Sequence, residues 1–162
     1  MTDFKIQTAG KADVPVLLAL IRELAEYEKL SDKVVVTASN LRQRLFGEGR
    51  VADAVLGYCR SEPVAYAVWY PTFSTFSGEA GFYLEDIFVK QDYRGRGYGR
   101  AIFCHIARAA RSQGFGKISW AVLDWNQSAI GFYRSLGARP APREWHVYAL
   151  DGEALASMAR EV

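Results

Sequence analysis

A glycine-rich segment between an expected strand and an expected helix constrains the fold of this chain most. Residues 94–100 read RGRGYGR. The apolar run 82–90 before them predicts a strand, and the apolar residues within 102–110 fall on one face of a helix. Glycine tolerates a positive φ and lets a ligand approach the backbone closely. A helix start presents N–H groups that suit a phosphate. The segment therefore predicts a strand-to-helix turn that captures a pyrophosphate.

The spacing of these glycines excludes two common phosphate-binding loops. A Walker loop ends in Gly-Lys-Ser/Thr, whereas this segment continues as Gly99-Arg100-Ala101. A dinucleotide fingerprint needs G-x-G-x-x-G, and residues 95–99 read G-x-G-x-G. The pattern that remains is Arg94-x-x-Gly97-x-Gly99.

A second motif lies about one helix and one strand further along the chain. Asn126 is a suitable helix cap, and Tyr133 follows seven residues later, which places both on one face of the expected helix. A tyrosine there can present its O–H to a ligand at the end of the preceding strand. It can equally be a core aromatic whose hydroxyl finds a backbone partner.

The composition predicts one intracellular domain. A chain of 162 residues with half of them hydrophobic supports a single core, so we expect one domain over residues 1–162. No apolar run is long enough to span a membrane, and the start of the chain has no signal-peptide pattern. We therefore expect a cytoplasmic protein. A net charge of +2 favours neither nucleic acid nor membrane as a partner.

Cysteine and histidine usage predicts no metal and no disulfide framework. The two cysteines are Cys59 and Cys104, and the two histidines are His105 and His146. None of them has metal-ligand spacing. Cys104 and His105 are neighbours on the expected helix, so their side chains diverge and do not form a nucleophile and base pair.

The pattern of elements predicts an α/β (α+β) domain with a mixed, mostly antiparallel sheet flanked by helices. Strands are expected at 4–8, 51–59, 63–70, 82–90, 117–123 and 145–150. Helices are expected at about 14–28, 38–46, 127–136 and 152–160, and a further helix is expected to follow the glycine-rich loop and to end at about 112. Residues 71–81 are expected to form a loop or an irregular extension of the strands.

The two motifs together resemble the GNAT superfamily of N-acetyltransferases, in which R/Q-x-x-G-x-G/A is the coenzyme A pyrophosphate loop. Within it, the segments 21–30, 83–87 and 121–127 resemble the diamine acetyltransferase family. That family includes spermidine/spermine acetyltransferases and thialysine Nε-acetyltransferases. Segments 26–32 and 121–127 are similar to the thialysine branch. The resemblance implies a GNAT fold with splayed central strands and acetyl-CoA as cosubstrate.

The resemblance also implies roles for individual residues. Tyr133 would protonate the departing thiolate, and Glu85 would contact the substrate amine directly or through water. The remaining substrate-binding residues would be Tyr27, Glu28 and Asp86, although a buried Asp86 can equally be structural. The cofactor-binding residues would be Ile87, Phe88 and Val89 through their main chain, Arg94, Gly95, Arg96, Gly97, Tyr98, Gly99 and Arg100 at the pyrophosphate, and Asn126, Ser128 and Ala129 elsewhere on coenzyme A.

Acid–base chemistry agrees with these roles. A lysine-type amine has a pKa near 10.4, so only about one in 10³ is neutral and nucleophilic at pH 7. A carboxylate such as Glu85 can bind the ammonium and accept its proton. A tyrosine phenol can protonate a thiolate of similar basicity. A bulge near residues 85–88 would free backbone N–H groups for the oxyanion and place Glu85 and Asp86 on one face.

The sequence leaves the amine open. The resemblance implies that spermine-selective members carry an acidic residue and a Trp before the central strand, whereas residues 72–79 here offer only Glu79. Arg143 or Gln127 could bind the carboxylate of a zwitterion. We therefore favour a thialysine- or lysine-like amine. A polyamine acetyltransferase and a catalytically silent coenzyme A sensor remain as alternatives. The resemblance further implies a homodimer with the C-terminal strand at its interface.

Overall fold

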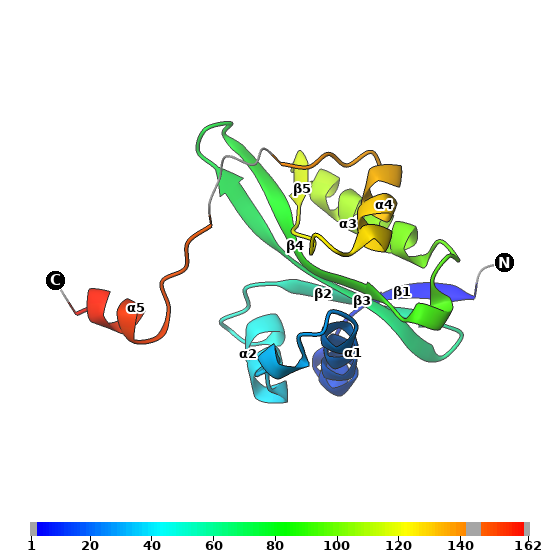
Figure 1. The fold of residues 1–162 in the computed structure, drawn as a ribbon, viewed down its shortest axis with the longest axis horizontal. Helices are drawn as coiled ribbons and strands as arrows, with labels where there is room; N and C mark the ends of the chain where they lie inside the picture. Colours follow the sequence, from blue (N-terminus) through cyan, green and yellow to red (C-terminus); the bar gives the residue numbers. More distant parts are fainter. Residues whose placement is uncertain (1–2, 142–146, 161–162) are drawn as a thin grey trace. The chain divides into compact units, whose positions relative to one another are not determined.

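The computed structural model describes residues 3–141 and 147–160, which form two compact units divided between Val122 and Leu123. The first unit holds an open five-stranded sheet whose spatial order follows the chain (Figure 1). Its strands are β1 (Phe4–Thr8), β2 (Asp53–Cys59), β3 (Glu62–Ser74), β4 (Glu79–Val89) and β5 (Lys117–Ser119). Strands β1 to β4 pair antiparallel, and β5 pairs parallel with β4. The expected mixed, mostly antiparallel sheet is confirmed.

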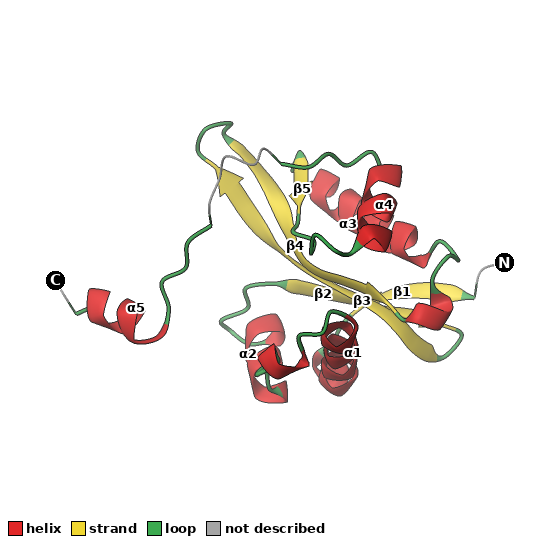
Figure 2. Cartoon of the chain, viewed as in Figure 1, coloured by secondary structure: helices red, strands yellow, loops and turns green. Residues whose placement is uncertain are grey.

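Helices cover both faces of this sheet. Helices α1 (Val14–Tyr27) and α2 (Ala38–Phe46) lie on one face, and α3 (Tyr98–Ser112) lies on the other (Figures 1 and 2). Short 3-10 turns cover Lys11–Asp13, Ser31–Lys33 and Gln91–Tyr93. The second unit contains α4 (Gln127–Ser135) and α5 (Gly152–Met158). Within the described ranges, no helix combines the length and the apolar character needed to cross a bilayer.

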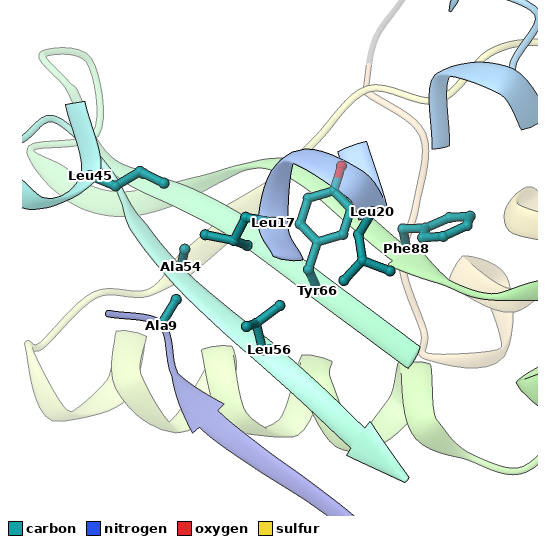
Figure 3. Packing of buried hydrophobic residues seen from close by; sticks show 8 residues of the cluster. All are labelled: Ala9, Leu17, Leu20, Leu45, Ala54, Leu56, Tyr66 and Phe88. Carbon is teal, nitrogen blue, oxygen red and sulfur yellow. The ribbon is translucent and has the colours of Figure 1, made fainter. Parts of the chain in front are cut away.

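The core between the sheet and helices α1 and α2 fixes the position of the end of α1. Leu17 and Leu20 of α1 are 0% and 1% exposed. They pack against strands β2, β3 and β4 because their three-residue spacing places both side chains on one face of the helix (Figure 3). The other buried members of this cluster are Ala9, Leu45, Ala54, Leu56, Tyr66 and Phe88.

Strand β5 is shorter than the sequence predicted. Only Gly81–Tyr83 of β4 pair with Lys117–Ser119, and the chain then leaves the sheet, although residues 117–123 were expected to be a strand. The indole of Trp120 packs against Phe103 of α3, with ring centroids 5.1 Å apart. In the described part of the chain, no strand pairs with the β5-facing edge of β4 beyond Tyr83. Strands β4 and β5 therefore part beyond Tyr83, in agreement with the expected splayed arrangement.

The expected last strand, 145–150, is wrong for the residues that can be assessed. Residues 145 and 146 lie outside the described ranges, and residues 147–150 form no strand. Their apolar pattern is typical of a strand, but a strand also needs a hydrogen-bonding neighbour. Val147 and Tyr148 are 98% and 91% exposed. The prediction of this strand rested on hydrophobic patterning, which does not identify the neighbouring strand that would pair with it.

Candidate active site

One unpaired residue in β4 organises the acidic side of the first unit. Val68 of β3 lies opposite Asp86, and the next residue, Trp69, lies opposite Leu84. Glu85 is therefore the extra residue of a β-bulge. Side chains alternate along a strand, so Glu85 faces away from Leu84, and the bulge then repeats the same face at Asp86. The bulge that the sequence analysis required for this arrangement is present.

On this face the carboxylates of Glu85, Asp86 and Glu28 lie near two tyrosines of β3. The tyrosines are Tyr66 and Tyr70, which the sequence alone did not indicate. The Tyr66 hydroxyl donates to Asp86 Oδ2 at 3.1 Å. Tyr70 stacks on Tyr83, with ring centroids 5.4 Å apart, and burial together with the Glu85 charge raises the pKa of Tyr70. Only the strand register identifies these tyrosines, because Tyr66 lies 20 residues before Asp86 and Tyr70 lies 15 residues before Glu85 in the chain.

Burial and mutual repulsion perturb the carboxyl groups. Burial is the larger cause that raises the pKa of Asp86 to about 6, and the charges of Glu85 and Glu28 add to it. The hydrogen bond from Tyr66 opposes this rise because it favours the charged form. Burial also raises the pKa of Glu28, which follows the last residue of α1. The region therefore favours a cationic group.

Arg94 connects the glycine-rich loop to the end of α1. Its guanidinium carbon lies 4.2 Å from the centre of the Tyr27 ring, and its Nε donates to the Val89 carbonyl at 2.9 Å. The structure thus directs Arg94 toward Tyr27 and β4. Arg96 Nη2 donates to the Asp92 carbonyl at 2.9 Å, so this side chain braces its own loop.

The loop ends in a glycine that caps α3 without a side chain. Gly95 and Gly97 have φ values of +75° and +83°. These are left-handed conformations that other residues adopt at a cost. Gly97 is the N-cap of α3, and a Cβ built on it meets nothing within 4 Å. The start of α3 is thus open to an anion where the N–H groups of Tyr98 and Gly99 have no intrahelical acceptor.

The edge of β4 beside this loop supplies main-chain groups. The Lys90 N–H donates to the Val64 carbonyl at 2.9 Å, across to β3. Backbone groups alternate sides along a strand, so those of Phe88 also face β3, and those of Ile87 and Val89 face the opposite edge. Phe88 instead contributes its side chain to the core, where it is 6% exposed. Of the three main-chain candidates, only Ile87 and Val89 have backbone N–H and C=O groups that face the edge of β4 opposite β3.

The second unit carries the other sequence-predicted residues on α4. Asn126 caps the helix, and its Oδ1 accepts from the Ala129 N–H at 3.2 Å, as predicted for a cap. Ser128 lies in the first turn, and Tyr133 lies near the last. Gln127 Nε2 donates to the Asp124 carbonyl at 2.8 Å. The candidates Arg143 and Glu144 lie outside the described residues.

Metal ligation finds no support in the part of the chain that the structure describes. No group of three or more His, Cys, Asp or Glu side chains is arranged there to hold an ion. The site thus consists of an open helix start, a free strand edge and a carboxylate cluster. Such a set can bind an anion and a cation, and it can move a proton.

Comparisons with known proteins agree with this description. The Acetyltransferase (GNAT) family matches residues 19–138, and the chain belongs to that family. Thialysine N-epsilon-acetyltransferase from Bos taurus is 39% identical over 95% of this chain and 96% of its own length. The enzyme of the same name from Sus scrofa is 38% identical over 98% and 99%. An integron cassette protein from the mobile metagenome of V. cholerae shares the fold, with a TM-score of 0.79, 24% identity and 99% of each chain covered. This chain is an N-acetyltransferase that transfers acetyl to an amine of a small molecule.

The perturbed carboxyl of Asp86 predicts a specific pH dependence of stability. The folded protein holds this proton more tightly than the unfolded chain, so stability falls as pH rises from about 4 to about 6. Asp86→Asn removes this loss. The free energy of unfolding of the variant relative to wild type should therefore increase by about 2–3 kcal/mol between pH 4 and pH 7. Urea unfolding at both pH values measures it.

The matched control is Asp92→Asn, because Asp92 is exposed on a 3-10 turn. It should change the free energy of unfolding by less than about 0.5 kcal/mol at either pH. An Asp86→Asn effect that does not vary with pH would contradict the account of this carboxyl.

Proposed function

We propose that this chain acetylates a thialysine- or lysine-like amine with acetyl-CoA, by direct attack in a ternary complex. The observation that carries the proposal is the bulge in β4, which sets Glu85 and Asp86 on one face near Glu28. A cationic amine suits this cluster, and the adjoining edge of β4 leads to the open start of α3. The single-domain organisation over residues 1–162 belongs to the proposal, and the family match across both units supports it.

Glu85 is proposed to bind the substrate ammonium and to take its proton, directly or through water. The neutral amine nitrogen then attacks the thioester carbonyl carbon, the carbon–sulfur bond breaks, and the nitrogen releases its remaining extra proton to solvent as the amide forms. Tyr133 gives the leaving thiolate its proton. Asp86 and Tyr27 complete the substrate end with Glu28. Asp86 is held by Tyr66 and is a neighbour of the reacting carboxylate, so it tunes the charge there.

Acetyl-CoA is proposed to lie along the edge of β4 and over the start of α3. Main-chain groups of Ile87 and Val89 bind the pantetheine arm. The pyrophosphate is bound by the segment from Gly95 to Arg100. Asn126, Ser128 and Ala129 contact the rest of the coenzyme.

Direct transfer is favoured over an acetyl-cysteine intermediate. Cys104 is exposed on α3, one residue before His105. The thiol of Cys59, at the end of β2, lies 3.4 Å from the hydroxyl of Tyr98. Neither thiol adjoins the carboxylates that would activate the amine.

The proposed assembly is a homodimer in the cytoplasm. The free cysteines fit a reducing compartment. Support for a dimer comes from apolar side chains in the second unit that are more than half exposed: Val147, Tyr148, Leu150, Leu155 and Met158. Light scattering at micromolar concentration should give twice the chain mass, and a monomer mass would contradict the dimer.

A panel of amines tests the substrate class. Release of free coenzyme A thiol is measured with thialysine, lysine, putrescine, spermidine and spermine under one condition. We expect kcat/KM for thialysine or lysine to exceed that for both spermidine and spermine by about tenfold, since one missing polar contact is worth that much. A tenfold preference for a polyamine would identify the alternative enzyme. Coenzyme A binding without amine-dependent thiol release would identify a sensor.

Replacement of Glu85 tests the proposed base. Glu85→Gln should lower kcat/KM for the amine about 10²-fold at pH 7, because a positioned base contributes on that order. The loss should shrink toward pH 10, where the free amine is abundant. Glu79→Gln is the matched control, an exposed glutamate of the same strand, and should stay within about twofold of wild type. A loss that is equal at all pH values would assign Glu85 to positioning.

Two glycines of similar backbone conformation separate cofactor binding from stability. Gly97 and Gly114 have φ values of +83° and +74°, and a Cβ on either meets nothing within 4 Å. Valine at either position should cost about 1–2 kcal/mol of stability through the backbone. Only Gly97→Val should raise the KM for acetyl-CoA, by about tenfold or more, because its side chain occupies the anion path. Equal KM values for the two variants would refute the loop's role.

A further inference from the structure

The glycine-rich loop contains one aromatic residue, Tyr98. Phosphate binding by backbone N–H groups does not require its side chain. It is the first residue of α3, directly after the Gly97 cap, and it is 7% exposed. Its ring stacks on Phe4 of β1, with centroids 4.0 Å apart and planes 6° from parallel. Its hydroxyl lies 3.4 Å from the Cys59 thiol at the end of β2. The loop is thus attached to the β1–β2 edge of the sheet through one side chain.

A glycine beneath Phe4 makes this attachment possible. A Cβ on Gly57 of β2 would lie 2.6 Å from Phe4 Cζ, 2.8 Å from Phe4 Cε2 and 3.0 Å from the Cβ of Ala65. These separations are too short for any side chain, so only glycine leaves room for the Phe4 ring over the strand. Gly57, Phe4 and Tyr98 therefore form a continuous stack from the sheet to the first turn of α3.

We propose that the Gly57–Phe4–Tyr98 stack positions the start of α3 for the pyrophosphate, with Tyr98 as the positioning residue. The proposal rests on the acetyl-CoA function proposed above. It adds that affinity for the coenzyme depends on a contact with β1, a strand that supplies no ligand to the coenzyme.

The need for such an anchor follows from the glycines around it. Gly95 and Gly97 supply left-handed turns, and a loop of this kind has many accessible backbone conformations when it is not held. The next fully buried side chain of α3 is Ile102, one turn further along. Tyr98 therefore restrains the turn whose N–H groups meet the phosphates, and a pre-ordered loop binds its ligand at lower entropic cost.

The experiment compares two half-buried phenylalanines that each pack on a buried aromatic ring beside α3. Phe4 stacks on Tyr98 at the start of the helix, and Phe115 packs edge-on against Phe82 beyond its end, with centroids 5.2 Å apart. The variants Phe4→Leu and Phe115→Leu delete comparable rings. Steady-state kinetics with both substrates gives KM and kcat, and thermal unfolding gives stability.

We expect Phe4→Leu and Tyr98→Leu to raise the KM for acetyl-CoA about tenfold, with kcat and the amine KM within about twofold of wild type. Tyr98→Phe keeps the stacked ring and should therefore raise the KM for acetyl-CoA less than Tyr98→Leu does. Phe115→Leu should lower the melting temperature but leave the KM for acetyl-CoA unchanged. Gly57→Ala provides an independent route to the same KM increase, because it displaces Phe4 without altering the loop.

Two results would overturn the inference. One is a KM for acetyl-CoA that is unchanged in folded Phe4→Leu and Gly57→Ala. The other is an equal KM increase in Phe115→Leu, which would assign the effect to general loss of packing. Calorimetry of wild type with coenzyme A separates this test from the proposed function. Binding by wild type is required for either variant result to count, and its absence refutes both proposals.

Discussion

The position of a single extra residue in β4 governs the chemistry that the rest of the fold can perform. Without the bulge at Glu85, strand alternation would send Glu85 and Asp86 to opposite faces of the sheet. One carboxylate would then point toward α3 and the other toward α1. With the bulge, both lie on the side of Glu28 and Tyr66. The buried core beneath α1 holds the end of that helix where Glu28 can join them.

Strand β4 links a region that attracts cations to a region that attracts anions. Its side chains gather negative charge on one face, which attracts an amine and raises the pKa of Asp86. Its β5-facing edge beyond Tyr83 leads to the start of α3, where the helix dipole favours an anion. The backbone of the sheet separates the carboxylates from the positive start of α3. A cationic amine and an anionic phosphate can therefore bind close together while each keeps its own binding groups. Arg94 lies between the two regions, engaged by Tyr27 and Val89.

The sequence predicted features that depend on local chemistry. The glycine-rich turn, the Asn126 cap and the strand–helix order from β1 to α4 follow from φ preferences, capping and hydrophobic periodicity, and the structure confirms them. It also named a bulge near Glu85 as the condition for placing Glu85 and Asp86 on one face, and the structure has that bulge. It could not predict Tyr66 as the partner of Asp86, because that contact depends on strand register. It overestimated β5, since apolar patterning does not reveal where two strands part.

Hydrogen exchange with and without coenzyme A tests most directly whether these regions form one cofactor site. Backbone N–H groups that bind the coenzyme, or that it covers, exchange more slowly when it is bound. The account predicts slower exchange in peptides covering residues 84–90, 94–101 and 126–133 with saturating coenzyme A, and unchanged exchange in α2. Unchanged exchange over 94–101, or slowing confined to α1 and α2, would contradict it.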